Sequence, residues 1–182
     1  MFLTVLFVVV CIFYLMPIFI VLMNSFKTNG ELLTDVMAWP QSFSFTNYAR
    51  TWDKMHYLRS LGNNLLLTVL SVTLIVLFSA LAGWRLCRTK TRLSSALFSL
   101  FVFSMLIPFS SIMIPLYRVV LALKVKNSLI GFSFVYAGLG VSMAIFLYHG
   151  FVKGIPLELE EAAAIDGCNM RHTFFSIVMP ML

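Results

Sequence analysis

Four of the seven acidic residues in this 182-residue chain lie within one short segment, LELEEAAAIDGCNM, which runs from Leu157 to Met170. They are Glu158, Glu160, Glu161 and Asp166. Carboxylates concentrated in this way can serve catalysis, bind a metal ion or make polar contacts with a partner. The rest of the sequence decides among these roles.

Catalytic and metal-binding patterns are absent from the sequence. There is no G-x-x-x-x-G-K-[ST] segment, so the chain has no phosphate-binding loop of its own, and there is no H-E-x-x-H pair. The three histidines lie in different segments, and the three cysteines show neither metal-ligand nor disulfide spacing. We therefore predict that the protein is not an enzyme and has no cofactor or metal site.

The acidic segment instead has the composition of a short helix. Pro156 suits a first helical turn, and the acidic residues after it suit the positive end of the helix dipole. The three alanines Ala162–Ala164 are strong helix formers, and Gly167 suits a left-handed stop at position C′. These signals predict a helix of about ten residues. The face that we expect it to present consists of Leu159, Ala162, Ala163 and Asp166.

The small, acidic surface of this helix favours a protein partner. Alanines let a partner approach closely, and a short helix can lie in a groove. The alternative is an amphipathic connector on the lipid headgroups, but such helices are usually rich in Lys, Arg and bulky apolar residues. The net charge of +6 does not indicate nucleic-acid binding, because no basic stretch is interleaved with aromatic residues.

The elements that position this helix have the composition of a membrane protein. Hydrophobic residues make up 60% of the chain and charged residues only 11%. Four segments run for about 20 residues or more without a charge, which is the length that a spanning helix needs. They are Phe2–Met23, Leu65–Trp84, Leu93–Ile114 and Leu129–Phe151. We predict an all-α, polytopic transmembrane helix bundle; four buried helices of a soluble protein are the alternative.

A fifth apolar segment begins after the acidic one. Only nine residues remain from Phe174 onward, or roughly 13 Å of helix against a hydrocarbon core of about 30 Å. We therefore expect the single transmembrane domain, 1–182, to be incomplete at its C-terminal end; a terminal helix at the membrane interface is the alternative. The segments on the two sides carry six and seven Lys and Arg residues, which leaves the orientation open.

Small residues within the predicted spans occur at the spacing of helix contacts. The pairs are Ser79 with Gly83, Gly138 with Ser142, and Gly140 with Ala144. They predict helices that pack closely with neighbours. No charged residue lies in the middle of a span, which does not favour an ion-coupled transporter. A path for a polar solute could be lined by Tyr136, Ser142 and Tyr148, although packing is an equal alternative for each.

The segment EAAAIDGCNMRHTFFSIVMP resembles the EAA motif of the permeases of ABC importers. That motif consists of Glu-Ala-Ala, three residues, Gly, nine residues, Ile, one residue, Leu and Pro. The matching positions are Glu161, Ala162, Ala163, Gly167, Ile177 and Pro180. Met179 replaces the Leu, which is a volume-conserving change.

Weaker matches, in the order of the family, extend the resemblance over nearly the whole chain. The segments MPIFIVLMNSFK, WPQSFSFTNY, GNNLLLTVL, LAGWRLCR and MLIPFSSIMIPLY are similar to segments of the maltose-type sugar permeases. Asn64 replaces a serine of the family pattern, and Gly83 and Trp84 replace an alanine and a tyrosine.

The resemblance implies six spans, of which four and the beginning of a fifth are expected here, and a cytoplasmic coupling loop at 152–173. It implies a multi-pass protein of the bacterial cytoplasmic membrane. Its implied partners are a pair of ABC ATPase subunits, a second permease subunit and an extracellular solute-binding protein. The ATPase-coupling residues carried over by the resemblance are Glu161, Ala162, Ala163, Ala164, Asp166 and Gly167.

We therefore interpret the chain as the permease subunit of an ATP-driven importer for a sugar or oligosaccharide. In such importers the short helix docks into a cleft of the ATPase. Glu161 and Asp166 would make polar contacts or cap the loop, and the alanines would allow close seating. The alternatives are a permease for another solute and a truncated, inactive remnant or scaffold; a membrane enzyme is disfavoured.

Overall fold

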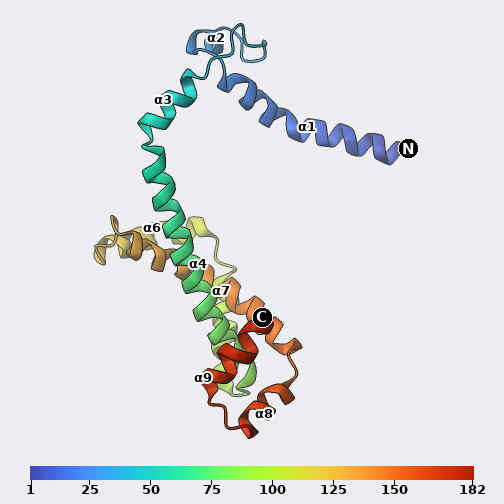
Figure 1. Ribbon diagram of the computed structural model, residues 1–182, viewed down its shortest axis with the longest axis vertical. Helices are drawn as coiled ribbons and strands as arrows, with labels where there is room; N and C mark the ends of the chain where they lie inside the picture. The colour runs from blue at the N-terminus through green and yellow to red at the C-terminus, as the bar shows by residue number, and fades with distance from the viewer. The chain divides into compact units, whose positions relative to one another are not determined.

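The computed structural model describes residues 1–182 as helices joined by short loops, without a β-strand. The all-α prediction is confirmed (Figure 1). The chain forms two compact units, Met1–Gly62 and Asn63–Leu182, and each is described by itself.

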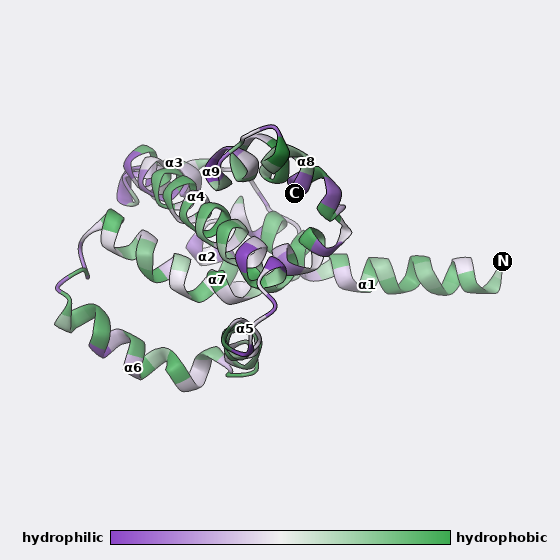
Figure 2. Ribbon diagram, turned by 90° about the horizontal axis from the view of Figure 1, so that it is seen from below, coloured by the Kyte–Doolittle hydropathy of each residue, from purple (hydrophilic) through white to green (hydrophobic).

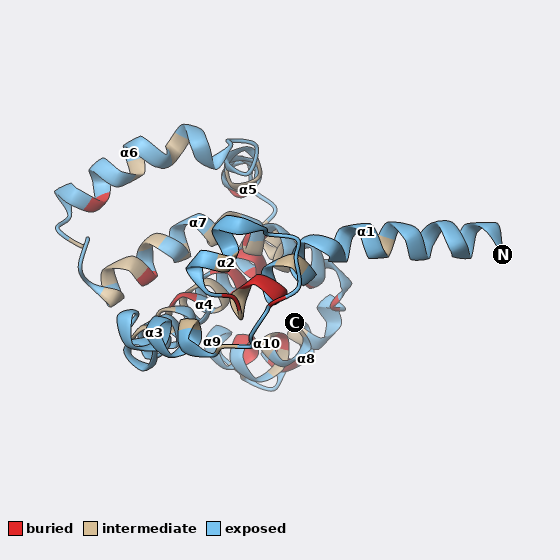
Figure 3. Cartoon of the chain, turned by 90° about the horizontal axis from the view of Figure 1, so that it is seen from above, coloured by how far each residue is buried: buried red, intermediate tan, exposed pale blue.

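The first unit begins with a long apolar helix, α1, Phe2–Ser25. Its length and hydropathy are those of a membrane span, as predicted for Phe2–Met23. Figure 2 shows hydrophobic residues along nearly all of α1, and Figure 3 shows that almost none of them is buried. Large apolar side chains without a polar face suit contact with lipid or with other helices.

The segment after α1 folds back on the end of that helix. It contains two shorter helices, α2, Asn29–Thr34, and α3, Thr46–Lys54. Lys27 is only 1% exposed, and its Nζ donates hydrogen bonds to the carbonyl oxygens of Asp35 (3.1 Å) and Val36 (3.2 Å). Asn47 Nδ2 donates to the carbonyl oxygens of Ser25 and Lys27. These bonds fix the loop without a large core.

The second unit contains the remaining helices. The first of them, α4, Tyr57–Arg88, begins within the first unit. The others are α5, Arg92–Ser104; α6, Phe109–Ala122; α7, Leu129–Gly154; α8, Leu157–Ile165; α9, Met170–Thr173; a π-helical turn, Phe174–Val178; and α10, Met179–Met181. Both α4 and α7 are long and apolar enough to cross a membrane, which agrees with two further predicted spans.

The predicted span Leu93–Ile114 is wrong as a continuous helix. The chain breaks between α5 and α6, and the two helices are bent by 104°. Pro108 precedes the first residue of α6, and a proline disfavours helical geometry in the residue before it. The pair meets the length and hydropathy of a span only when both helices are taken together.

Close contacts between α4 and α7 confirm part of the small-residue prediction. A Cβ atom added at Gly83 would lie 2.9 Å from Tyr148 Cβ, and one at Gly140 would lie 2.7 Å from Ile75 Cδ1. The Ser79 hydroxyl is fully buried and donates to the carbonyl oxygen of Val141 (3.3 Å). Gly138 differs, because nothing lies within 4 Å of a Cβ built there.

The buried apolar cluster of the second unit lies at the C-terminal end of α4. It consists of Ala80, Trp84, Val152, Ile155, Phe174 and Val178. Figure 1 shows the C-terminal segment beside this end of α4, close to α8 and α9. The acidic helix therefore lies next to the best-packed part of the unit.

Candidate functional site

The acidic segment folds as the short helix α8, which is nine residues long. Glu158 and Glu160 lie in its first turn, where negative charge is favoured by the helix dipole. Pro156 stands at the N-cap, one position earlier than the predicted first turn, with an extended ψ of 132°. The helix prediction is confirmed, and its beginning is shifted by one residue.

Gly167 ends α8 as predicted. Its φ is +83°, in the left-handed region that favours glycine. The N–H of Cys168 donates to the Ala163 carbonyl oxygen (2.9 Å), and the N–H of Gly167 donates to that of Ala164 (3.1 Å). These two bonds define a Schellman motif, in which the last carbonyl groups of a helix find donors.

The face that we predicted for α8 is wrong at one position. Ala163 is only 4% exposed and lies toward the interior of the unit, whereas Leu159, Ala162 and Asp166 are exposed. The helix is too short for i, i+4 spacing to decide which side is buried, because the alanines fit either side. The exposed members of the predicted coupling set are Glu161, Ala162, Ala164, Asp166 and Gly167.

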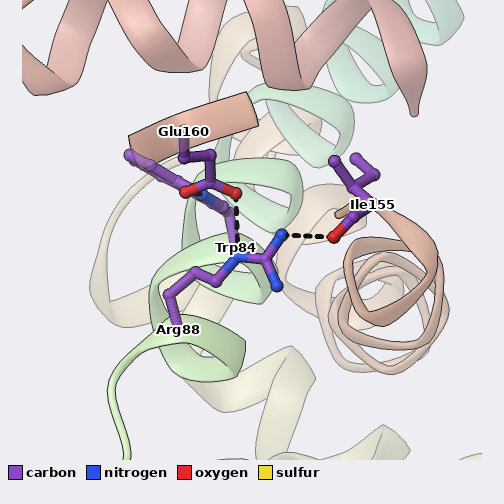
Figure 4. Close-up of polar contacts among 4 residues, drawn as sticks. All are labelled: Trp84, Arg88, Ile155 and Glu160. Carbon is purple, nitrogen blue, oxygen red and sulfur yellow. Dashed lines mark hydrogen bonds and ion pairs between the residues drawn. The ribbon is translucent and has the colours of Figure 1, made fainter. Parts of the chain in front are cut away.

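The inner side of α8 is held by a polar group that we call the Glu160 network: Trp84, Arg88, Ile155 and Glu160 (Figure 4). Trp84 Nε1 donates to Glu160 Oε2 (2.9 Å), and Arg88 Nε donates to Glu160 Oε1 (2.7 Å). Arg88 Nη2 donates to the carbonyl oxygen of Ile155 (2.8 Å). Both oxygens of the Glu160 carboxylate are therefore bonded.

Glu160 is the site residue that the sequence reasoning missed. Its side chain is only 11% exposed, and that of Arg88 is 19% exposed. One signal was available, because Trp84 and Arg88 are four residues apart and so lie on the same side of α4. A tryptophan N–H and an arginine on one side of a helix together require an acceptor when they are shielded from water.

The other end of the loop is attached to the same helix. The ring of Trp84 packs against that of Phe174, with centroids 5.2 Å apart. Phe174 is fully buried and follows directly after α9, whose first turn is capped by the Asn169 side chain. The segment after the predicted coupling loop, 152–173, thus contacts Trp84, the same residue of α4 that donates a hydrogen bond to Glu160 of α8.

The three residues predicted for a solute path do not lie together. Tyr136 is half exposed and lines a cavity of about 350 Å³ with Asn64, Thr68 and Ser71. Ser142 lines a separate cavity of about 460 Å³ and accepts a hydrogen bond from the Ser104 hydroxyl (2.7 Å). Tyr148 packs against Gly83 and the buried cluster.

Residues 75–182 match the family "Binding-protein-dependent transport system inner membrane component". The chain belongs to this family. The match includes the C-terminal part of α4, the whole segment 152–173 and every residue of the Glu160 network. The resemblance to ABC importer permeases is therefore confirmed, and membership of a transport family agrees with the prediction of a non-enzymatic role.

Two curated relatives align with nearly all of the chain. It is 37% identical over 180 residues to "Probable starch degradation products transport system permease protein AmyC" of Thermoanaerobacterium thermosulfurigenes. It is 34% identical over 180 residues to "Melibiose/raffinose/stachyose import permease protein MelC" of Bacillus subtilis (strain 168). The alignments cover 99% and 98% of this chain but 65% of each relative, so the chain spans less than two thirds of their length.

Proposed function

We propose that this chain is part of the permease subunit of an ATP-driven, binding-protein-dependent importer for a sugar or an oligosaccharide. Its family supports a role in transport across a membrane. The names of the two relatives refer to starch degradation products and to melibiose, raffinose and stachyose, which supports a carbohydrate as the solute. Three helices of spanning length and one bent pair supply apolar segments for a path.

The exposed side of α8 is the observation that carries this proposal. Glu161, Ala162 and Asp166 are exposed there, while Glu160 and Ala163 hold the opposite side within the unit. A helix that is fixed from behind and presents small and acidic residues in front suits docking into a groove of another protein. We assign that groove to a cytoplasmic ABC ATPase subunit.

The proposed mechanism is a coupling free energy between two sites. ATP binding draws the two ATPase subunits together and displaces the α8 helix that is seated on each permease. The arrangement of the spans that accepts the displaced helix then becomes the more stable one, which changes access to the solute path. Glu161 and Asp166 provide polar contacts, Ala162 and Ala164 allow close approach, and Gly167 provides the turn.

The proposed location is the bacterial cytoplasmic membrane, with several spans and with α8 on the cytoplasmic side. The bond between Arg88 and Glu160 brings the basic segment 85–92 to the same end of the second unit as α8. That segment holds four Lys and Arg residues in eight, a density that favours the cytoplasmic side. A second permease subunit and an extracellular solute-binding protein complete the proposed assembly.

Tyr136, Ser142 and Tyr148 remain our proposed path residues. Tyr136 and Ser142 lie beside cavities that contain other hydroxyl or amide groups, which suits a polar solute. Tyr148 packs in the contact between α4 and α7, so it would line the path at that contact.

The test uses the full-length permease, coexpressed with its second permease subunit and its ATPase. We expect Glu161→Lys to reduce ATPase co-purification and sugar uptake by about tenfold or more, because a charged contact with the partner is reversed. Asp53→Lys is the matched control, since it makes the same charge change at an exposed position of α3. Unchanged ATPase recovery and uptake in Glu161→Lys would contradict the proposed docking surface.

A further inference from the structure

We propose that the Glu160 network transmits the displacement of α8 to α4, so that Glu160 is a positioning residue for transport and not a contact to the ATPase. This inference rests on the proposed function of α8 as the docking helix. It assigns different roles to two adjacent carboxylates, Glu160 and Glu161.

The first argument is that both oxygens of the Glu160 carboxylate already accept hydrogen bonds from within the unit, and that the side chain is largely shielded. Arg88 Nε lies 2.7 Å from Oε1 and Trp84 Nε1 lies 2.9 Å from Oε2. The side chain of Glu160 is only 11% exposed, whereas Glu161 is an exposed residue. A carboxylate that accepts a bond at each oxygen from a shielded guanidinium and an indole is held in one orientation.

The second argument is that the donors belong to one rigid element. Trp84 and Arg88 lie one turn apart near the C-terminal end of α4, a helix of 32 residues. Trp84 is buried as a member of the apolar cluster, so its indole N–H is fixed in position. A displacement of α8 is therefore transmitted to α4 through two hydrogen bonds, those from Trp84 and Arg88 to Glu160.

The third argument is that the same two side chains also hold the loop on both sides of α8. Arg88 Nη2 donates to the carbonyl oxygen of Ile155, the C-cap residue of α7, just before α8 begins. The Trp84 ring packs against Phe174, just after α9 ends. The beginning, the helix and the end of the coupling loop are thus all attached to two neighbouring residues of α4.

The fourth argument is that α8 has little else to hold it. Ala163 is its one buried residue. The methyl group of Ala163 packs against its neighbours but does not fix the orientation of α8 as a hydrogen bond does. Without the Glu160 carboxylate, α8 can still dock on the ATPase through its exposed side. Its displacement is then taken up by movement of the loop, and less of it reaches the spans.

The experiment compares ATP hydrolysis with solute uptake in proteoliposomes that contain the full-length permease, its second permease subunit, the ATPase and the binding protein. The variants are Glu160→Gln, which keeps the size of the side chain, and Trp84→Phe, which keeps an aromatic ring and removes the N–H donor. We expect both to retain ATPase co-purification and ATP hydrolysis. The solute transported per ATP should fall by about tenfold in Glu160→Gln, within the usual range of coupling between sites, and by a smaller factor in Trp84→Phe, which removes one of the two bonds.

A charge exchange separates positioning from a general loss of structure. Arg88→Glu and Glu160→Arg each remove the ion pair, and the double variant restores a pair of opposite sign at the same place. We expect each single change to lower the solute transported per ATP, and the double variant to recover a substantial part of it. Should Glu160→Gln fold poorly, Trp84→Phe still tests the inference, because it removes the indole donor to Glu160 while the Arg88–Glu160 pair remains to support folding.

The outcomes distinguish this inference from the proposed function. Loss of ATPase co-purification in Glu160→Gln, to the extent seen in Glu161→Lys, would make Glu160 a partner contact and would overturn the inference. An unchanged ratio of solute to ATP in both Glu160→Gln and Trp84→Phe would also overturn it. Normal ATPase recovery in Glu161→Lys instead contradicts the docking surface itself.

Discussion

Arg88 and Glu160, which are 72 positions apart in the sequence, are joined by a hydrogen bond of 2.7 Å between Nε and Oε1. The bond connects the C-terminal end of α4 to the inner side of α8. Exposed ion pairs contribute little to stability, but this pair is largely shielded and shares its carboxylate with the Trp84 N–H. It is therefore a fixed attachment point for a helix that has only one buried residue, Ala163.

Replacing Gly167 should reduce transport because it strains the backbone, and not because the new side chain meets a neighbour. Nothing lies within 4 Å of a Cβ built at Gly167, but its φ is +83°. We expect Gly167→Val to cost about 1–2 kcal/mol in the local loop conformation, because left-handed geometry is unfavourable for a side chain branched at Cβ. Solute uptake by the full-length protein should fall while membrane insertion is retained.

Gly154→Val is the control for this change. Gly154 also has open space around it but no positive φ. Gly167→Asn should retain more uptake than Gly167→Val, since asparagine tolerates left-handed geometry. Equal uptake by the two valine variants would show that the left-handed turn is not needed.

The acidic helix and its glycine stop were predictable because their signals are local. Charges in the first turn, a run of alanines and a glycine at C′ act within about two helical turns. The local sequence is therefore enough to predict the helix and its end. The Glu160 network was not predictable in this way. It depends on α4 and α8 meeting in space, and several acidic residues of α8 were equal candidates to face α4.

The bend between α5 and α6 shows a second limit of the sequence reasoning. The charge-free run Leu93–Ile114 has the composition of a span whether the helix is continuous or broken. Pro108 was the local signal for a break, since the residue before a proline leaves helical geometry. The small residues show the same limit. Their spacing identified Gly83 and Gly140, but only the contact between α4 and α7 distinguishes these two from Gly138.

A methyl group at Gly83 should disturb the contact between α4 and α7. The added Cβ would lie 2.9 Å from Tyr148 Cβ and 3.0 Å from the backbone nitrogen of His149. Because backbone cannot move aside cheaply, we expect Gly83→Ala to destabilise the folded protein by about 1–3 kcal/mol. The measurement is the thermal stability of the detergent-solubilised, full-length protein. Gly138→Ala is the control and should be tolerated, and equal stability of both variants would contradict the close approach.

Removing the Lys27 ammonium should loosen the segment that follows α1. Lys27 Nζ donates to the carbonyl oxygens of Asp35 and Val36 from a buried position. We expect Lys27→Met to cost about 1–3 kcal/mol locally, because two carbonyl groups lose their donor. Hydrogen exchange of the amides in 28–46 should become faster. Lys54→Met, at an exposed position of α3, is the control and should leave this exchange unchanged. Equal exchange in the two variants would show that the Lys27 hydrogen bonds do not hold this segment.

The central claim, that the exposed side of α8 docks on an ATPase subunit, is tested most directly by a photoreactive amino acid at Ala162. This position is exposed on α8 and takes no part in the Glu160 network. The same amino acid at Thr51, an exposed position of α3, is the control. In membranes containing the full-length importer, we predict a covalent adduct with the ATPase from position 162 and none from position 51. Adducts from position 162 with lipid alone, or equal ATPase adducts from both positions, would contradict the account.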